Sequence, residues 1–128
     1  MACLVICESP SMKVVYCDFE TETKLTMPYI PGFLAFREVP AYTPLFTRLK
    51  KNSPSLWPQV LLVDGNGLLH TRGFGAACHI GVAFDVPAIG CAKQPFAVDG
   101  LTKETMKKKV QKELTKRGQF VELVGHSG

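Results

Sequence analysis

Residues 60–63, with the sequence VLLV, constrain the fold more than any other part of the chain. The run is apolar and rich in β-branched residues, which predicts a strand buried on both faces of a helix-covered sheet. Asp64 follows at once, and Gly65, Asn66 and Gly67 then turn the chain. Open α/β sheets bind ligands at the edge where such strands end. Asp64 is therefore a candidate ligand-binding carboxylate, with an Asx-turn as the competing interpretation.

The other hydrophobic patterns predict a mixed order of strands and helices in one domain of 128 residues. Strands are expected at 2–7 and 13–19, consecutive and antiparallel, with a third candidate at 21–26. Two helices are expected between 33 and 51, one ending at Glu38 and one starting near Pro40. A helix at 73–82, a buried strand at 88–92, a helix at 101–117 and a candidate strand at 120–124 follow. This order predicts one mixed sheet flanked by helices.

Composition narrows the class of protein. Hydrophobic residues make up 46% of the chain and charged residues 20%, as in globular proteins. No run of about 18 apolar residues predicts a membrane span, and the N-terminus lacks the basic region of a signal peptide. Five cysteines without a CxxC pair predict reduced thiols, buried as small hydrophobes in an intracellular protein. A net charge of +4 permits a nucleic-acid partner without requiring one.

Two further residues are candidates for chemistry. Tyr29 lies on a loop stiffened by two prolines, where a ring can stack on or wedge beside a base. Packing on the core is the commoner role of such a tyrosine. Glu38 ends a mostly apolar segment, so it is either paired with Arg37 or Arg48 or shares a divalent cation with Asp64. Paired carboxylates that hold Mg²⁺ are typical of phosphodiester cleavage.

The helix expected at 101–117 is strongly basic. Apolar residues at 106, 110 and 114 form a narrow stripe, and lysines that include Lys107 and Lys108 fill most of the remaining surface. This pattern is typical of a solvated helix face. The alternative is a patch that contacts nucleic-acid phosphates. His79 lies in an apolar segment and is interpreted as a core histidine rather than a ligand.

Four blocks occur in the order YIPGFLAFRE, LLVDGNGLLH, RGFGAACHIG and IGCAK. Through these blocks nearly the whole chain resembles the endonuclease V family of inosine-specific nucleases, and its animal members most. The resemblance implies an RNase H-like fold that binds Mg²⁺ or Mn²⁺ with acidic residues on its sheet. It also implies hydrolysis of the second phosphodiester 3′ to inosine, in single-stranded RNA in preference to DNA, in the cytoplasm or alternatively the nucleus or nucleolus.

The resemblance further implies roles for individual residues. Glu38 and Asp64 match metal-binding carboxylates, His70 matches a histidine near the active site, and Lys93 matches a lysine close to the scissile phosphate. Tyr29 matches the wedge that fills the gap left by the extruded inosine. Glycines let the backbone approach a flat base edge. Together with the basic helix, the substrate-binding candidates are Tyr29, Pro31, Gly32, Gly67, Gly90, Lys107 and Lys108.

The resemblance also implies that the sheet is incomplete. Family members begin with a first strand that carries a metal-binding Asp, and they continue past the final H-S-G with a further catalytic acid or His. The sequence has no match for either feature. An absent strand leaves an unpaired edge within the sheet, which predicts self-association, and two carboxylates hold Mg²⁺ weakly. A non-catalytic module that binds inosine or RNA is the alternative function.

Overall fold

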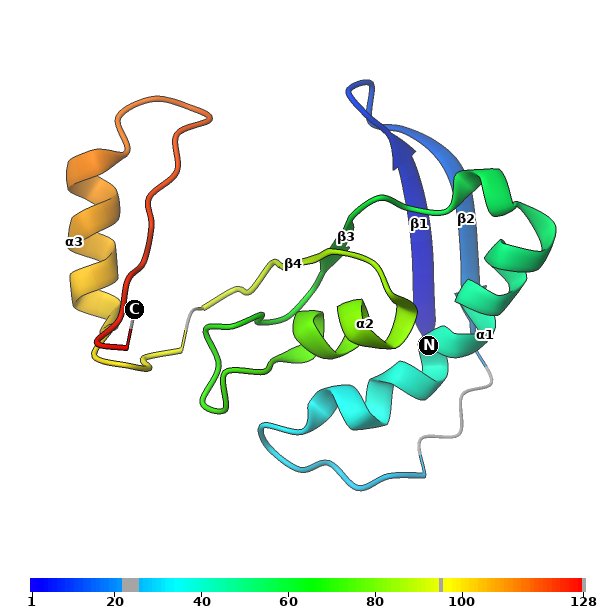
Figure 1. Ribbon diagram of the computed structural model, residues 1–128, viewed down its shortest axis with the longest axis horizontal. Coiled ribbons are helices and arrows are strands. Elements are labelled where there is room, and N and C mark those ends of the chain that lie inside the picture. The colour runs from blue at the N-terminus through cyan, green and yellow to red at the C-terminus, as the bar shows by residue number, and fades with distance from the viewer. Residues whose placement is uncertain (22–25, 95, 128) are drawn as a thin grey trace.

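The described part of the chain, residues 1–21, 26–94 and 96–127 of a computed structural model, is built from short strands and three α-helices (Figure 1). The strand candidate at 21–26 lies mainly outside the described residues. The expected order of strands and helices up to the basic helix is otherwise found, except that one helix replaces the two expected between 33 and 51. The elements are β1 (Ala2–Glu8), β2 (Lys13–Glu20), α1 (Leu34–Asn52), a 3₁₀ turn η1 (Pro54–Leu56), β3 (Leu61–Val63), α2 (Ala76–Phe84), β4 (Ala88–Gly90) and α3 (Lys103–Glu113).

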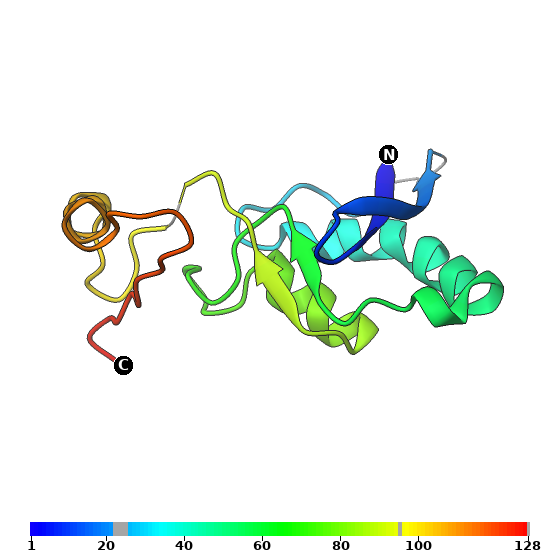
Figure 2. The same cartoon turned by 90° about the horizontal axis from the view of Figure 1, so that it is seen from above.

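The described strands form two separate pairs (Figure 2). β1 and β2 are antiparallel, as expected, with Ala2 opposite Glu20. β3 and β4 are parallel, with Leu61 opposite Ala88. Among the described residues no backbone ladder joins β1 to β3, so the single mixed sheet expected from the sequence is divided.

One apolar core joins both strand pairs to the helices. Leu45 and Leu49 on α1 are fully buried, and Ala41 precedes them at the same helical spacing. β1 contributes Ala2 and Leu4 to the same core cluster. The segments around β3 and α2 add Leu61, Ile80 and Val86. Because the cluster spans all these elements, α1 and α2 are fixed on one side of both strand pairs (Figure 2).

α1 is a single helix, so the expected break near Pro40 is wrong. Pro40 and Pro44 each remove a helical backbone donor, which costs about 3 kcal/mol relative to alanine. The buried stripe runs unbroken past both prolines, and its burial outweighs their cost. Within the described ranges, no helix has the combined length and apolarity of a membrane span.

The helices cover only one face of the strands. On the other face, 67% of Leu62 and 54% of Ile89 are exposed, so the expectation of strands buried on both faces is wrong. The expectation that the cysteines are buried is wrong for the same reason, because the cysteines of β1 and β2 lie on the uncovered face. All five thiols are free; Cys78 is half-buried, and the exposed ones are Cys3, Cys7, Cys17 and Cys91.

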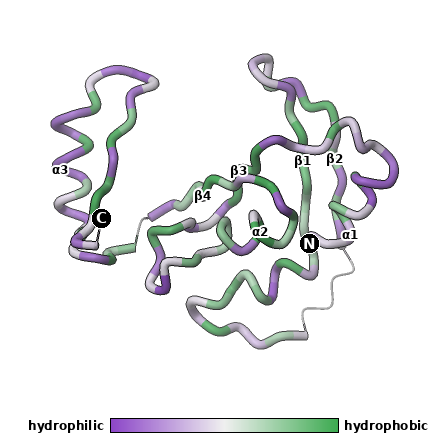
Figure 3. The backbone as a smooth tube through the Cα atoms, viewed as in Figure 1, coloured by the Kyte–Doolittle hydropathy of each residue, from purple (hydrophilic) through white to green (hydrophobic). Residues whose placement is uncertain are grey.

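α3 and the segment after it lie apart from the strands (Figure 1). The helix begins with a capping box between Thr102 and Thr105, buries Met106 and is otherwise mostly hydrophilic (Figure 3). The Lys109 ammonium donates to the carbonyl oxygen of Glu122 at 2.6 Å and holds the following segment beside the helix. Residues 120–124 form no strand, contrary to expectation, because their backbone runs beside a helix rather than along a sheet edge.

Candidate functional site

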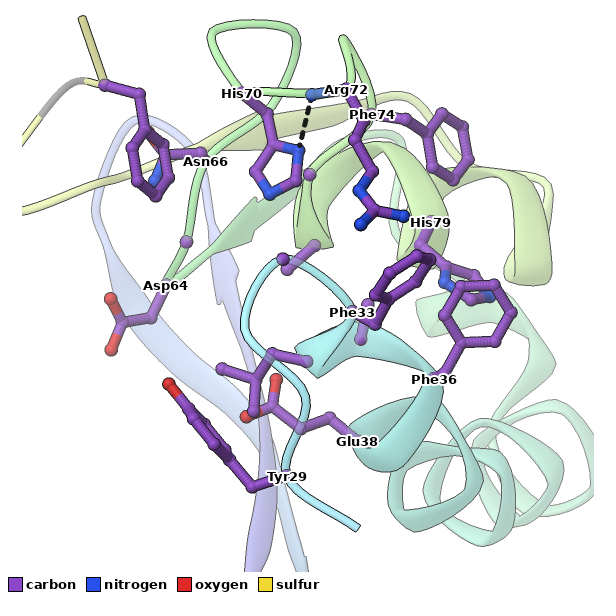
Figure 4. Close-up of a pocket in the computed structure, with 17 residues that line it drawn as sticks. Tyr29, Phe33, Phe36, Glu38, Asp64, Asn66, His70, Arg72, Phe74 and His79 are labelled. Carbon is purple, nitrogen blue, oxygen red and sulfur yellow. Dashed lines mark hydrogen bonds between the residues drawn. The ribbon is translucent and has the colours of Figure 1, made fainter. Parts of the chain in front are cut away.

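A cavity of about 590 Å³ lies where the loop before α1 meets the end of β3 and the start of α2 (Figure 4). Tyr29 and Gly32 line it from the loop, and Glu38 lines it from the first turns of α1. Asp64 follows β3 directly, and His70 comes from the next loop. The fold thus brings together in one cavity five residues that the sequence indicated from separate segments.

Glu38 and Asp64 lie within electrostatic reach of each other. Burial raises the pKa of the Glu38 carboxyl, the charge of Asp64 raises it further, and Arg37 opposes both effects. The pKa of the Tyr42 phenol is raised by burial and then by both carboxylates, which shows that the two charges act on one region. The two carboxylates therefore line the same cavity and influence each other electrostatically, Glu38 from a half-buried position and Asp64 from an exposed one.

Arg48 is not the partner of Glu38, although the sequence allowed it. Its Nε donates to the Asp18 carboxylate at 2.7 Å and its Nη1 donates to Glu20 at 3.1 Å. The hydrogen bond from Arg48 is also the main reason that the pKa of Asp18 lies below its usual value. Arg48 thus ties α1 to β2 and leaves Glu38 to the cavity.

The turn after Asp64 is held by close backbone packing. A Cβ on Gly90 of β4 would lie 2.6 Å from both the Gly65 oxygen and the Gly67 nitrogen. The Gly75 amide donates to the Gly67 carbonyl at 2.9 Å from the start of α2. Gly67 and Gly90, indicated by the sequence as substrate-binding, are not among the residues that line the cavity and lie behind it. In this position they fix the backbone that carries Asp64.

His70 is a buried polar side chain of the described chain, 9% exposed. Its Nδ1 accepts a hydrogen bond from the Arg72 backbone amide at 3.3 Å, so the proton of the neutral ring lies on Nε2. The ring also makes an edge contact with Phe96 at 5.5 Å between centroids. These contacts fix the orientation of the imidazole at the cavity wall (Figure 4).

Other residues indicated by the sequence do not line the cavity. Pro31 is exposed and adjoins Gly32 on the same loop. Lys93 is exposed and lies beyond β4, and its assignment to the scissile phosphate stays a prediction. Lys107 and Lys108 are exposed on α3, apart from the cavity (Figure 1).

The cavity also has aromatic and cationic walls that the sequence analysis did not assign. His79 is half-buried and contacts Phe36 at 4.6 Å and Phe74 at 5.9 Å, so it belongs to the cavity wall rather than to the core. The Arg72 guanidinium lies over the Phe33 ring, 3.4 Å from its centroid. The available signal was the R-x-F sequence that begins two residues after His70, because binding residues are often carried on such loops.

The carboxylate pair fits a hard divalent cation through its oxygen donors. Mg²⁺ is usually held by one or two carboxylates, and water and substrate phosphates complete its coordination. The raised pKa of Glu38 marks a negative charge that a cation would stabilise. Across residues 1–21, 26–94 and 96–127, no cluster of three or more His, Cys, Asp or Glu side chains is arranged as a metal site. Glu38 and Asp64 are therefore the candidate ligands of this part of the chain.

Comparisons of the sequence and of the structure with known proteins all match the same family. A family model described as Endonuclease V matches residues 1–127. The chain is 49% identical to human endonuclease V over 127 residues, which are 99% of this chain and 45% of the human protein. It matches the crystal structure of the catalytic domain of human endonuclease V with a TM-score of 0.87 and 48% identity, covering 98% of this chain and 51% of that one. A Ciona intestinalis endonuclease V, crystallised with a 23mer DNA containing an inosine followed by a ribo-adenosine, matches with a TM-score of 0.83 and 35% identity, covering 98% of this chain and 52% of that one.

The fold and the cavity define an α/β protein of the RNase H-like class with a carboxylate pair at a strand exit. Its structural neighbours share that fold. The chain belongs to the endonuclease V family. It spans about half the length of the human relative, and 37% of the length of the mouse one.

Proposed function

We propose that this chain carries the inosine-recognition surface and two metal-binding acids of a nuclease that cleaves the second phosphodiester 3′ to inosine. The observation that carries the proposal is the convergence of Glu38, Asp64 and Tyr29 on one cavity in a member of the endonuclease V family. The Ciona relative, crystallised with inosine-containing DNA, supports a nucleic-acid substrate.

The carboxylates and His70 would perform the polar part of this function. Glu38 and Asp64 would hold Mg²⁺, or Mn²⁺, which when bound acidifies water and stabilises charge on the phosphate. Burial raises the pKa of Glu38, so occupation of the site by a cation also favours its charged form. His70 has an Nε2 proton available for donation, because its Nδ1 is occupied by the Arg72 amide.

The loop before α1 would recognise the extruded base. Tyr29 is 63% exposed beside the cavity, which suits a ring that stacks against a neighbouring base. Gly32 has a φ of 80°, and its lack of a side chain lets a base edge approach the backbone. Extrusion costs a few kcal/mol and less in single strands, which favours a single strand over a duplex as the substrate. RNA in preference to DNA is what the family resemblance implies.

A cleavage assay tests this proposal. Single-stranded RNAs that differ only by inosine or adenosine, and the corresponding DNAs, are incubated with the chain in Mg²⁺ or in EDTA. Mg²⁺-dependent cleavage at the second bond 3′ to inosine is expected, with loss in Glu38→Gln and in Asp64→Asn. Asp85→Asn is the matched control, because Asp85 is an acid outside the cavity. Equal cleavage of inosine and adenosine RNA, or full activity of both acid variants, contradicts the proposal.

A non-catalytic inosine-binding module is the second candidate. It is favoured by the observation that the cavity of the described chain holds two carboxylates without a third potential metal ligand grouped with them. In a binding titration with the same RNAs, such a module binds inosine RNA more tightly than adenosine RNA, and in the cleavage assay it leaves both uncut in Mg²⁺.

A further inference from the structure

Arg72 places a positive charge in the wall of the same cavity. Its guanidinium lies 3.4 Å from the centroid of Phe33, and the cavity that it lines also contains Glu38 and Asp64 (Figure 4). The side chain extends from the loop above α1 toward the interior of the cavity. Within the described ranges, the ion pairs between side chains involve Arg48 and not Arg72.

The backbone and the ring together hold this side chain in place. The Arg72 amide donates to His70 Nδ1 at 3.3 Å, and the Gly73 amide donates to the His70 carbonyl at 2.8 Å. A cation over an aromatic face is attracted by the ring quadrupole. Arginine stacked in this way keeps the N–H groups at the edge of its planar fork available for an acceptor. Arg72 is therefore a positioned cation whose donors are free for a ligand in the cavity.

We propose that Arg72 binds a phosphate of the nucleic-acid strand that enters this cavity. This inference rests on the proposed function and adds to it a residue that grips the backbone. A phosphate presents two oxygens that match the guanidinium fork, whereas a neutral base offers no charge to pair with it. The carboxylate pair requires a cation between itself and the strand. Arg72 contacts the strand directly, so it contributes to affinity whether or not a metal is bound.

Binding measured in EDTA isolates this contact from cleavage. The probe is a short single-stranded RNA with one inosine, titrated against the unchanged chain, Arg72→Ala, Arg72→Lys and Phe33→Leu. Arg72→Ala is expected to weaken binding about tenfold, as for other hydrogen bonds to charged groups. It also lowers the slope of log K against log salt by about 0.7, the value for one phosphate on a single strand. Lys51→Ala, a loss of equal charge at the far end of α1, is the matched control.

The two conservative variants separate geometry from charge. Arg72→Lys keeps the charge and so keeps the salt slope, but it loses the fork and weakens binding. Phe33→Leu keeps an apolar side chain but removes the ring that holds Arg72, and it weakens binding in the same direction. Melting curves confirm that every variant is folded before its affinity is compared.

A neutral phosphate analogue identifies the contact. In a set of RNAs, each phosphate in turn is replaced by a neutral methylphosphonate. One of these replacements should weaken binding to the unchanged chain and leave the affinity of Arg72→Ala unaltered. If the losses of binding free energy from the methylphosphonate and from Arg72→Ala add at every position, Arg72 contacts no phosphate. Arg72 would then stack on a base or make no contact, and the inference would be overturned. An affinity of Arg72→Ala within twofold of the unchanged chain overturns the inference as well. If the unchanged chain still cleaves RNA specifically at inosine, the proposed function stands in that case. Failure of the unchanged chain to bind the RNA overturns the proposed function and this inference together.

Discussion

Gly90→Ala tests whether close packing behind the cavity positions Asp64. The added Cβ would lie 2.6 Å from the Gly65 oxygen and the Gly67 nitrogen, whereas Cβ contacts under 3.0 Å essentially do not occur. Both neighbouring atoms belong to backbone, so they cannot rotate away as a side chain would. The turn after Asp64 must therefore move by about 0.4 Å or more, at an overpacking cost of about 1–3 kcal/mol.

Thermal melting and the cleavage assay measure the two consequences of that shift. The melting temperature should fall by about 4 °C for each kcal/mol lost in a domain of this size. Cleavage should fall about tenfold, because a misplacement of about 1 Å costs about 100-fold and the expected shift is about half of that. Gly67→Ala is the matched control, since a Cβ there meets nothing within 4 Å and its φ is not positive. Its melting temperature should stay unchanged or rise slightly.

Equal melting temperatures for Gly90→Ala and Gly67→Ala would refute this reasoning. So would a Gly90→Ala chain that is destabilised yet cleaves normally, because the turn would then move without moving Asp64. A loss of cleavage in both variants at unchanged stability would instead assign both glycines to direct contact with the base, as the family resemblance implies.

Three further predictions concern charge. Glu38→Gln should stabilise the chain at pH 7 but not below about pH 4.5. The pKa of Glu38 is raised in the folded chain, so ionisation of this carboxyl lowers the stability of the unchanged chain as the pH rises through that pKa, and glutamine does not ionise. Melting temperatures of both chains from pH 4 to 8 measure the difference. Asp18→Asn should destabilise at pH 7 and converge with the unchanged chain in acid, because the pKa of Asp18 is lowered and its contribution disappears as the pH falls through it; acid titration of unfolding checks the convergence. Replacing Lys107 and Lys108 by alanine should reduce the salt slope of RNA binding by about 0.7 for each lost phosphate contact; an unchanged slope assigns both lysines to a solvated face.

The sequence predicts the residues of the candidate site better than the packing of strands and helices around that site. Asp64 at a strand exit and Glu38 after the proline loop are local features, and the structure brings both to one cavity. The stripe that begins at Met106 likewise predicts a helix with one buried side. These features follow from short-range periodicity and turn chemistry, which a single sequence contains.

What the sequence could not predict depends on contacts between distant segments. The prolines at 40 and 44 suggest a helix break, but the buried stripe of the same helix packs against β1 and keeps the helix intact. Leu62 and Ile89 belong to apolar runs of the kind found in strands buried on both faces. The sequence of these runs does not show whether another element covers their second face, and both side chains are exposed. The Arg72–Phe33 contact joins two loops 39 positions apart, a distance over which sequence periodicity carries no information.

The charges of the cavity explain why it should depend on a ligand. Burial and the charge of Asp64 raise the pKa of Glu38, Arg37 opposes them only in part, and Arg48 on the same helix is bound to Asp18 and Glu20 instead. Glu38 is half-buried and Asp64 is exposed, so the charged form of Glu38 is disfavoured at neutral pH, and an external cation beside both acids would favour it. Arg72, held on an aromatic ring in the same wall, presents the opposite charge. Because acids and arginine occupy separate positions rather than pairing with each other, each remains available to a different ligand, the acids to a metal ion and the arginine to a phosphate.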